Sequence, residues 1–84
     1  RQLAVEWGKA GIRVNAVAPG VISTPMLTIG DHPDVLDAYL RDRVPLGTLG
    51  RADDVASACL FLVSDGAAYI SGAVLPVDGG AGAA

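Results

Sequence analysis

The feature that most constrains the fold is a pair of short β-like segments, residues 12–18 and 73–77, with a long helical stretch between them. The first segment alternates apolar residues and ends at a Pro-Gly pair, and the second ends at an Asp-Gly-Gly turn sequence. Strands that are joined through helices pair in parallel, and helices cover both faces of a parallel sheet. The sequence therefore predicts an α/β fold. Two parallel strands are not a stable sheet alone, so we expect further strands beside them.

Three helices are predicted around these strands, over residues 1–11, 33–44 and 50–65. Pro33 suits the first position of the second helix, and Pro45 ends it because proline disfavours helical geometry in the residue before it. In the third helix, apolar residues recur nearly all round the helical wheel. We therefore expect the third helix to be packed on more than one side.

Composition and one proline narrow the class of protein further. The chain of 84 residues carries a net charge of −3, which does not favour a nucleic-acid partner, and no apolar run approaches the roughly 18 residues of a membrane span. The single Cys59 cannot form an internal disulfide, and together with His32 it is too little for a zinc site. Pro76 cannot donate to a sheet, so residues 73–77 are predicted to be an edge strand. We expect a cytoplasmic globular protein without a metal site.

The loop after the first strand is the candidate binding site. In open α/β sheets, ligands bind beyond the carboxyl ends of the strands. Gly20 lets the backbone approach a flat ligand, Pro19 fixes the turn, and the Thr24 hydroxyl can both donate to and accept from a carboxamide. An apolar cover follows: Pro25, Met26, Leu27 and Ile29. The residues alone leave a second interpretation open, an ordinary strand-to-helix loop with a turn proline.

Three blocks of the chain resemble the C-terminal part of the classical short-chain dehydrogenase/reductases. They are RVNAVAPGVISTPM, GRADDVASACLFLVSDGAAYISG and VDGG, at residues 13–26, 50–72 and 77–80. A fourth, LAVEWGKAGIRVN at residues 3–15, resembles the end of the helix that carries the family's Tyr-x-x-x-Lys pair. The resemblance implies a Rossmann-type doubly wound parallel sheet. Residues 1–84 would be the C-terminal fragment of a single NAD(P)-binding domain, with its last two strands and their covering helices.

The resemblance also implies that residues 19–49 hold the cofactor and cover the substrate. Backbone groups of Ile22 and the hydroxyl of Thr24 would bind the carboxamide of NAD or NADP. The nicotinamide ring would lie against Pro19, Gly20 and Val21. The substrate would be lined by Pro25, Met26, Leu27 and Tyr39. The implied reaction is hydride transfer between nicotinamide and a small-molecule alcohol/ketone or 3-oxoacyl substrate.

The chain departs from the family pattern where catalysis is concerned. It lacks the glycine-rich phosphate loop and the catalytic serine, tyrosine and lysine. Tyr39 is followed four residues later by Arg43 and Tyr69 by Ala73, while Lys9 has no tyrosine before it. We therefore expect no catalytic residue in this chain and no activity of the chain alone, although the intact parent would be an oxidoreductase. The alternative is a non-catalytic Rossmann-like binding or oligomerisation module.

The remaining expectations concern association and structural residues. In the family, the last strand and the helix before it often pack across a two-fold axis. We therefore expect a homo-oligomer, a dimer or a homotetramer, that associates through residues 50–65 and 73–77. Asp53 and Asp54 are expected to be helix-start charges rather than an acid/base pair, and Asn15 to make a structural hydrogen bond.

Overall fold

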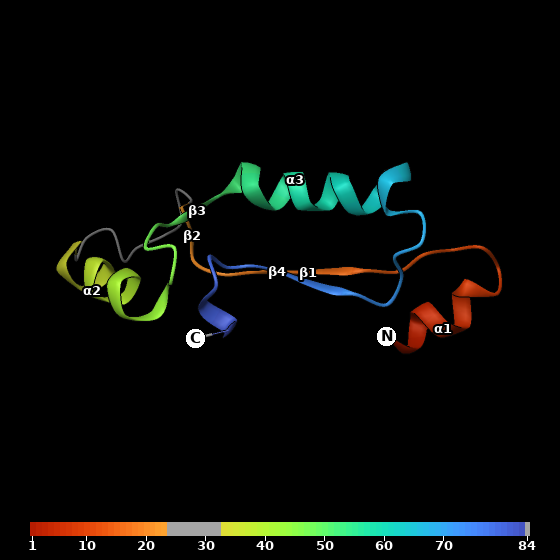
Figure 1. Ribbon diagram of the computed structural model, residues 1–84, viewed down its shortest axis with the longest axis horizontal. Coiled ribbons are helices and arrows are strands. Elements are labelled where there is room, and N and C mark those ends of the chain that lie inside the picture. Colours follow the sequence, from red (N-terminus) through yellow and green to blue (C-terminus); the bar gives the residue numbers. More distant parts are fainter. Residues whose placement is uncertain (24–32, 84) are drawn as a thin grey trace.

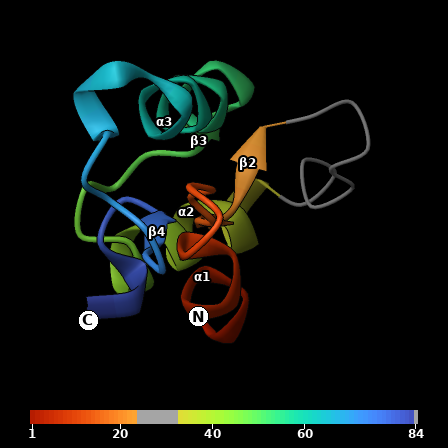
Figure 2. The ribbon, with the colours of Figure 1, turned by 90° about the vertical axis from the view of Figure 1, so that its right-hand side faces the viewer.

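The computed structural model describes residues 1–23 and 33–83. Along the chain it contains α1 (Gln2–Gly8), β1 (Ala16–Pro19), β2 (Ile22–Ser23), α2 (Pro33–Arg43), β3 (Gly50–Arg51), α3 (Ala52–Val63) and β4 (Val74–Val77). Short 3₁₀ turns at Asp65–Ala67 and Ala81–Ala83 follow α3 and β4. Helix α3 runs along the β1–β4 pair, and α2 lies beyond one end of it (Figure 1). Figure 2 shows α1 on the side of this pair opposite to α3.

Strands β1 and β4 pair in parallel, which confirms the predicted α/β class. The N–H groups of Ala16 and Gly20 donate to the carbonyls of Ala73 and Val77, at 2.9 and 3.0 Å. The backbone N–H and C=O groups of every second residue of β4 therefore point toward β1. The nitrogen of Pro76 lies on the other side of the strand. The ladder between the two strands consequently loses no donor to the proline.

The first strand begins later than the alternation predicts. A strand was predicted over residues 12–18, whereas β1 covers Ala16–Pro19. The approach to β1 is held by a side chain instead, because the Asn15 amide accepts from the Ala73 N–H and donates to the Ile70 carbonyl, both at 3.0 Å. A side-chain amide replaces the backbone ladder there, so the prediction is wrong at the amino end of the strand. The structural role expected for Asn15 is confirmed.

The helix boundaries follow the prolines and glycines of the sequence. Helix α2 starts at Pro33, as predicted, and ends at Arg43, one residue before the predicted end. Helix α1 ends at Gly8, and Gly11 has a φ of 79°, the left-handed geometry that closes many helices. Helix α3 is shorter than the predicted 50–65. Residues 50 and 51 belong to β3, and the helix ends at Val63. In the described part of the chain, no helix is both long and apolar enough to cross a membrane.

The chain buries little of its apolar surface. Its accessible area is 6177 Å², against about 4,700 Å² for a compact protein of this mass. Its radius of gyration is 15.7 Å, against about 12 Å for a compact domain of this length. Among the described residues, the buried apolar side chains are Val44, Leu62 and Ala67. Large apolar side chains are exposed on α1, α3 and β4: Leu3, Val5, Trp7, Leu60, Phe61, Val63 and Val74.

Among the described residues, only the inner side of helix α3 is packed against the strands. Its inner side faces β1 and β4 (Figure 2), where Leu62 is buried. On its outer side, Leu60 and Val63 remain 68% and 76% exposed. The sequence predicted cover on more than one side, and the described residues supply it only from the strands.

Candidate functional site

Three chain segments meet beyond the carboxyl ends of β1 and β4. They are residues 19–23, residues 44–50 after α2, and the turn at 78–82. The first segment leaves β1 at Pro19, which is exposed. This end of a parallel pair is where α/β sheets bind ligands, so the three segments define the candidate site.

Gly20 is packed against the first residue after β4. A Cβ placed on Gly20 would lie 2.9 Å from both Cα and Cβ of Asp78, closer than real Cβ atoms approach other atoms. The sequence interpretation gave this glycine a role in the approach of a flat ligand. The structure adds a second requirement, because the two backbones can meet only where residue 20 has no side chain.

Val21 and Ile22 join the site to the segment after α2. The Gly50 N–H donates to the Val21 carbonyl at 3.1 Å, and Ile22 pairs in parallel with Gly50. A Cβ on Gly50 would lie 2.6 Å from Cδ1 of Ile22, so a side chain there would push the end of the Ile22 side chain aside. In a parallel pair, bonding groups alternate along the strand, so the N–H and C=O of Ile22 lie on the side away from β3. They take no part in the pairing with β3.

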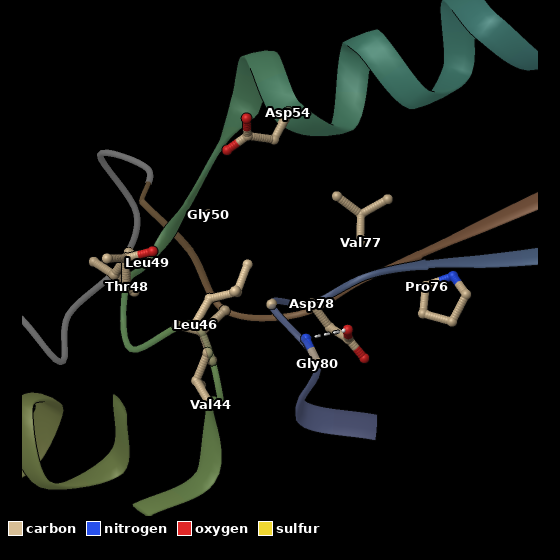
Figure 3. A pocket seen from close by; sticks show the side chains of 12 residues that line it. Val44, Leu46, Thr48, Leu49, Gly50, Asp54, Pro76, Val77, Asp78 and Gly80 are labelled. Carbon is tan, nitrogen blue, oxygen red and sulfur yellow. Dashed lines mark hydrogen bonds between the residues drawn. The ribbon is translucent and has the colours of Figure 1, made fainter. Parts of the chain in front are cut away.

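A cavity of about 430 Å³ lies between these segments. Figure 3 shows Leu46 and Val44 on one side of it, Val77 and Asp78 on another, and Asp54 at the start of α3. Its described lining residues are Val21, Val44, Leu46, Thr48, Leu49, Gly50, Asp54 and 76–80. Half-buried Tyr39 of α2 is not among them. The predicted site residues Thr24, Pro25, Met26 and Leu27 lie outside the described residues.

The charged groups near the site stabilise the start of helix α3. An Asp54 carboxylate oxygen accepts from the Arg51 N–H at 2.8 Å, at the first turn of α3. Asp53 lies 3.7 Å from the Arg51 guanidinium, and both side chains are exposed. The expectation that these aspartates are helix-start charges is confirmed.

On α2, the hydrogen bond from Arg41 to Asp42 raises the pKa of Arg41, which stays charged. Within residues 1–23 and 33–83, no group of three metal-ligating side chains occurs.

A second hollow, of about 610 Å³, lies between β1 and α3. Its lining is mostly apolar and includes Val17, Val55 and Cys59. At its end, Nη1 of Arg13 donates to the carbonyls of Leu62 and Ile70, at 2.7 and 3.2 Å. This guanidinium joins the last turn of α3 to the approach to β4, so its role in this chain is structural.

Sequence reasoning missed two parts of the site. It placed Gly50 in the third helix, whereas Gly50 pairs with Ile22 and lines the cavity together with Leu46, Thr48 and Leu49. It also treated Asp78-Gly79-Gly80 only as a turn at an edge strand. An aspartate before two glycines is a turn signal in which the carboxylate often bonds to the backbone two residues on, and that signal was available.

Comparison with known proteins identifies the family. The family profile described as enoyl-(acyl carrier protein) reductase matches residues 1–82. Galactitol 2-dehydrogenase (L-tagatose-forming) of Cereibacter sphaeroides is 46% identical over 81 residues, which are 95% of this chain and 32% of that protein. The 3-oxoacyl-[acyl-carrier-protein] reductase FabG of Pseudomonas aeruginosa is 49% identical over 80 residues, again 95% of this chain and 32% of that protein. The chain thus spans about a third of the length of these relatives.

Solved structures agree with the sequence relatives. A 4-hydroxyisoleucine dehydrogenase complexed with NADH superposes with a TM-score of 0.91 at 34% identity, over 99% of this chain and 34% of that one. A structure from Agrobacterium tumefaciens with bound NADP, provisionally assigned as a 2-deoxy-D-gluconate 3-dehydrogenase, gives 0.90 at 43% identity, over 99% and 34%. The predicted Rossmann-type fold class is confirmed.

Proposed function

The chain belongs to the short-chain dehydrogenase/reductase family, and from this premise we propose that it is the C-terminal segment of an NAD(P)-dependent oxidoreductase. The full-length enzyme exchanges a hydride between nicotinamide and an alcohol/ketone or 3-oxoacyl substrate. The observation that carries the proposal is the position of residues 20–22, which follow a parallel strand at its carboxyl end, with the N–H and C=O of Ile22 on the side away from β3. Relatives of the chain are dehydrogenases and reductases of this chemistry.

The nicotinamide half of NAD or NADP would be held by the segment after β1. The N–H and C=O of Ile22, which lie on the side away from β3, suit a carboxamide that both donates and accepts. The Thr24 hydroxyl would complete that contact. Pro19, Gly20 and Val21 would form the surface against the ring, and Pro19 and Gly20 are exposed.

These residues orient the reaction rather than perform it. When bound, the cofactor supplies or accepts the hydride. The contribution of Ile22 and Thr24 is to fix one ring face toward the substrate carbon, because transfer requires near-contact distance and alignment. Pro25, Met26, Leu27 and Tyr39 would line the substrate and exclude water from it. The catalytic serine, tyrosine and lysine of the family have no counterpart in these 84 residues, so the chain by itself would be inactive.

The exposed apolar face supports association of the full-length enzyme with copies of itself. Phe61 and Val74, on α3 and β4, are each 48% exposed, and Leu60 is 68% exposed. Exposed apolar patches of this kind mark interaction sites. A dimer or homotetramer of a cytoplasmic enzyme would cover them through α3 and β4. The alternative is a non-catalytic Rossmann-like binding or oligomerisation module, and a Tyr-x-x-x-Lys pair shortly before Arg1 in the full-length sequence would favour the enzyme over it.

The contact assigned to Thr24 provides the test of the proposed function. In the full-length enzyme, Thr24→Val keeps the side-chain shape and removes the hydroxyl, so the KM for NAD(P)H should rise about fivefold, the worth of one neutral hydrogen bond. Thr24→Ser is the matched control and should keep the wild-type KM. Steady-state kinetics with each cofactor measure both. Equal KM values for the valine and serine variants would contradict the assignment.

A further inference from the structure

The turn after β4 is closed by one side chain. The two carboxylate oxygens of Asp78 accept from the N–H groups of Gly80 and Gly82, both at 3.0 Å. The first of these bonds is drawn in Figure 3. Gly79 and Gly80 have φ values of 63° and 93°, geometry that L side chains rarely adopt. The carboxylate therefore fixes the path of a turn that would otherwise have the conformational freedom of its glycines.

This turn lies directly against the loop assigned to nicotinamide. The Gly20 N–H donates to the carbonyl of Val77 at 3.0 Å. The site of a Gly20 Cβ is 2.9 Å from Asp78, so no side chain separates the two backbones. A displacement of Asp78 toward Gly20 must therefore displace the loop that starts there.

The same turn holds the segment that follows α2. The Leu46 N–H donates to the Gly79 carbonyl at 3.0 Å. A Cβ on Gly79 would lie 2.8 Å from Cγ1 of Val44, one of the few buried apolar side chains. The turn thus contacts both the cofactor loop and the segment that lines the cavity beside it.

We propose that Asp78 is a positioning residue for the nicotinamide ring. It acts through the turn, since its carboxylate holds residues 78–82 in the path that supports Gly20, and residues 20–22 in turn orient the ring. The proposal rests on the proposed function. It goes beyond the proposed function by giving a catalytic consequence to a residue that the proposed function assigns no contact with cofactor or substrate. A purely local role in closing the C-terminal turn is the competing explanation.

The two explanations predict different kinetics in the full-length enzyme. Asp78→Ala removes both acceptors, and a misplacement of the ring of about 1 Å costs up to about 100-fold in rate, so kcat/KM for NAD(P)H should fall about 10- to 100-fold. Asp78→Asn keeps one acceptor oxygen and should recover part of the loss. ADP-ribose, or its 2′-phosphate if NADP is the cofactor, lacks nicotinamide and should bind both variants within about twofold of wild type, because misplacement of the ring is what lowers the rate. Asp65→Ala, an exposed aspartate in the turn after α3, is the control and should match wild type.

Each outcome decides the proposal. Loss of kcat/KM with intact ADP-ribose binding and recovery in Asp78→Asn supports it. Unchanged kcat/KM in Asp78→Ala, or parallel loss of kcat/KM and ADP-ribose binding in both variants, overturns it in favour of a purely structural role. If the wild-type enzyme neither binds nor oxidises NADH or NADPH, the proposed function fails first, and this proposal falls with it.

Discussion

The two ends of the β1–β4 pair are held together by different means. At the amino end, side chains bond to backbone: Asn15 reaches Ile70 and Ala73, and Arg13 reaches Leu62. At the carboxyl end, backbones meet directly, as Gly20 does with Asp78. The link between the two strands requires particular side chains at the amino end, whereas at the carboxyl end it requires the absence of a side chain at Gly20.

We therefore expect the amino end to contribute to stability alone and the carboxyl end to contribute to function as well. A side chain that bonds across the amino end contributes to folding and lies far from the carboxyl end, where ligands bind. At the carboxyl end, close glycine contacts leave the exposed surfaces of Pro19 and Gly20 for a ligand. Substitutions at the first end should therefore change the free energy of unfolding alone, and substitutions at the second should also change cofactor use.

The largest loss of stability is expected from Asn15→Ala in the full-length enzyme. It removes two hydrogen bonds and leaves the Ala73 N–H without its partner, so unfolding should require about 2–4 kcal/mol less. Asn15→Asp is the matched variant, because it keeps the acceptor for Ala73 but places a carboxylate oxygen, in place of a donor, against the Ile70 carbonyl. Denaturant unfolding measures both. If the folded variant had a changed KM for the cofactor, the amino end would not contribute to stability alone, which would contradict the distinction between the two ends.

Gly20→Ala tests the other end. The added methyl collides with Asp78, which should lower stability by about 1–3 kcal/mol and reduce kcat/KM for NAD(P)H about 10- to 100-fold through displacement of the loop. Gly66→Ala is the matched control, because its Cβ would make ordinary contacts of 3.5 and 3.6 Å with Ser64 and Phe61. If Gly20→Ala altered stability without altering kinetics, the two ends would not differ as described.

The smallest effect is expected at Asp54, which lines the cavity but accepts a hydrogen bond from the Arg51 backbone. Asp54→Ala leaves the Arg51 N–H without its acceptor and should lower stability by about 1 kcal/mol, as the loss of a helix cap does. Asp53→Ala, in the same turn, loses only an exposed ion pair and should change stability by less than about 0.5 kcal/mol. Cofactor kinetics should be unchanged in both variants. A clear kinetic defect in Asp54→Ala would assign this carboxylate to the binding site.

The sequence contained much of the fold because its strongest signals are local. Pro33 and Pro45 fix α2 through backbone geometry alone, and the helices between two β-like segments require parallel pairing. The site was only partly predictable. The pairing of Ile22 with Gly50 and the contact of Gly20 with Asp78 join residues far apart in the chain, and no periodicity encodes them. The prediction of the amino end of the first strand was wrong for a related reason. The hydrogen bonds of Asn15 depend on partners more than fifty residues away.

The most direct test of the account is a crystal structure of the full-length enzyme with NADH or NADPH bound. We expect the carboxamide to lie within hydrogen-bond distance of the Ile22 backbone and the Thr24 hydroxyl. The ring should lie against residues 19–21, with Asp78 still bonded to Gly80. A nicotinamide ring that binds elsewhere and leaves residues 19–24 without a cofactor contact would contradict it.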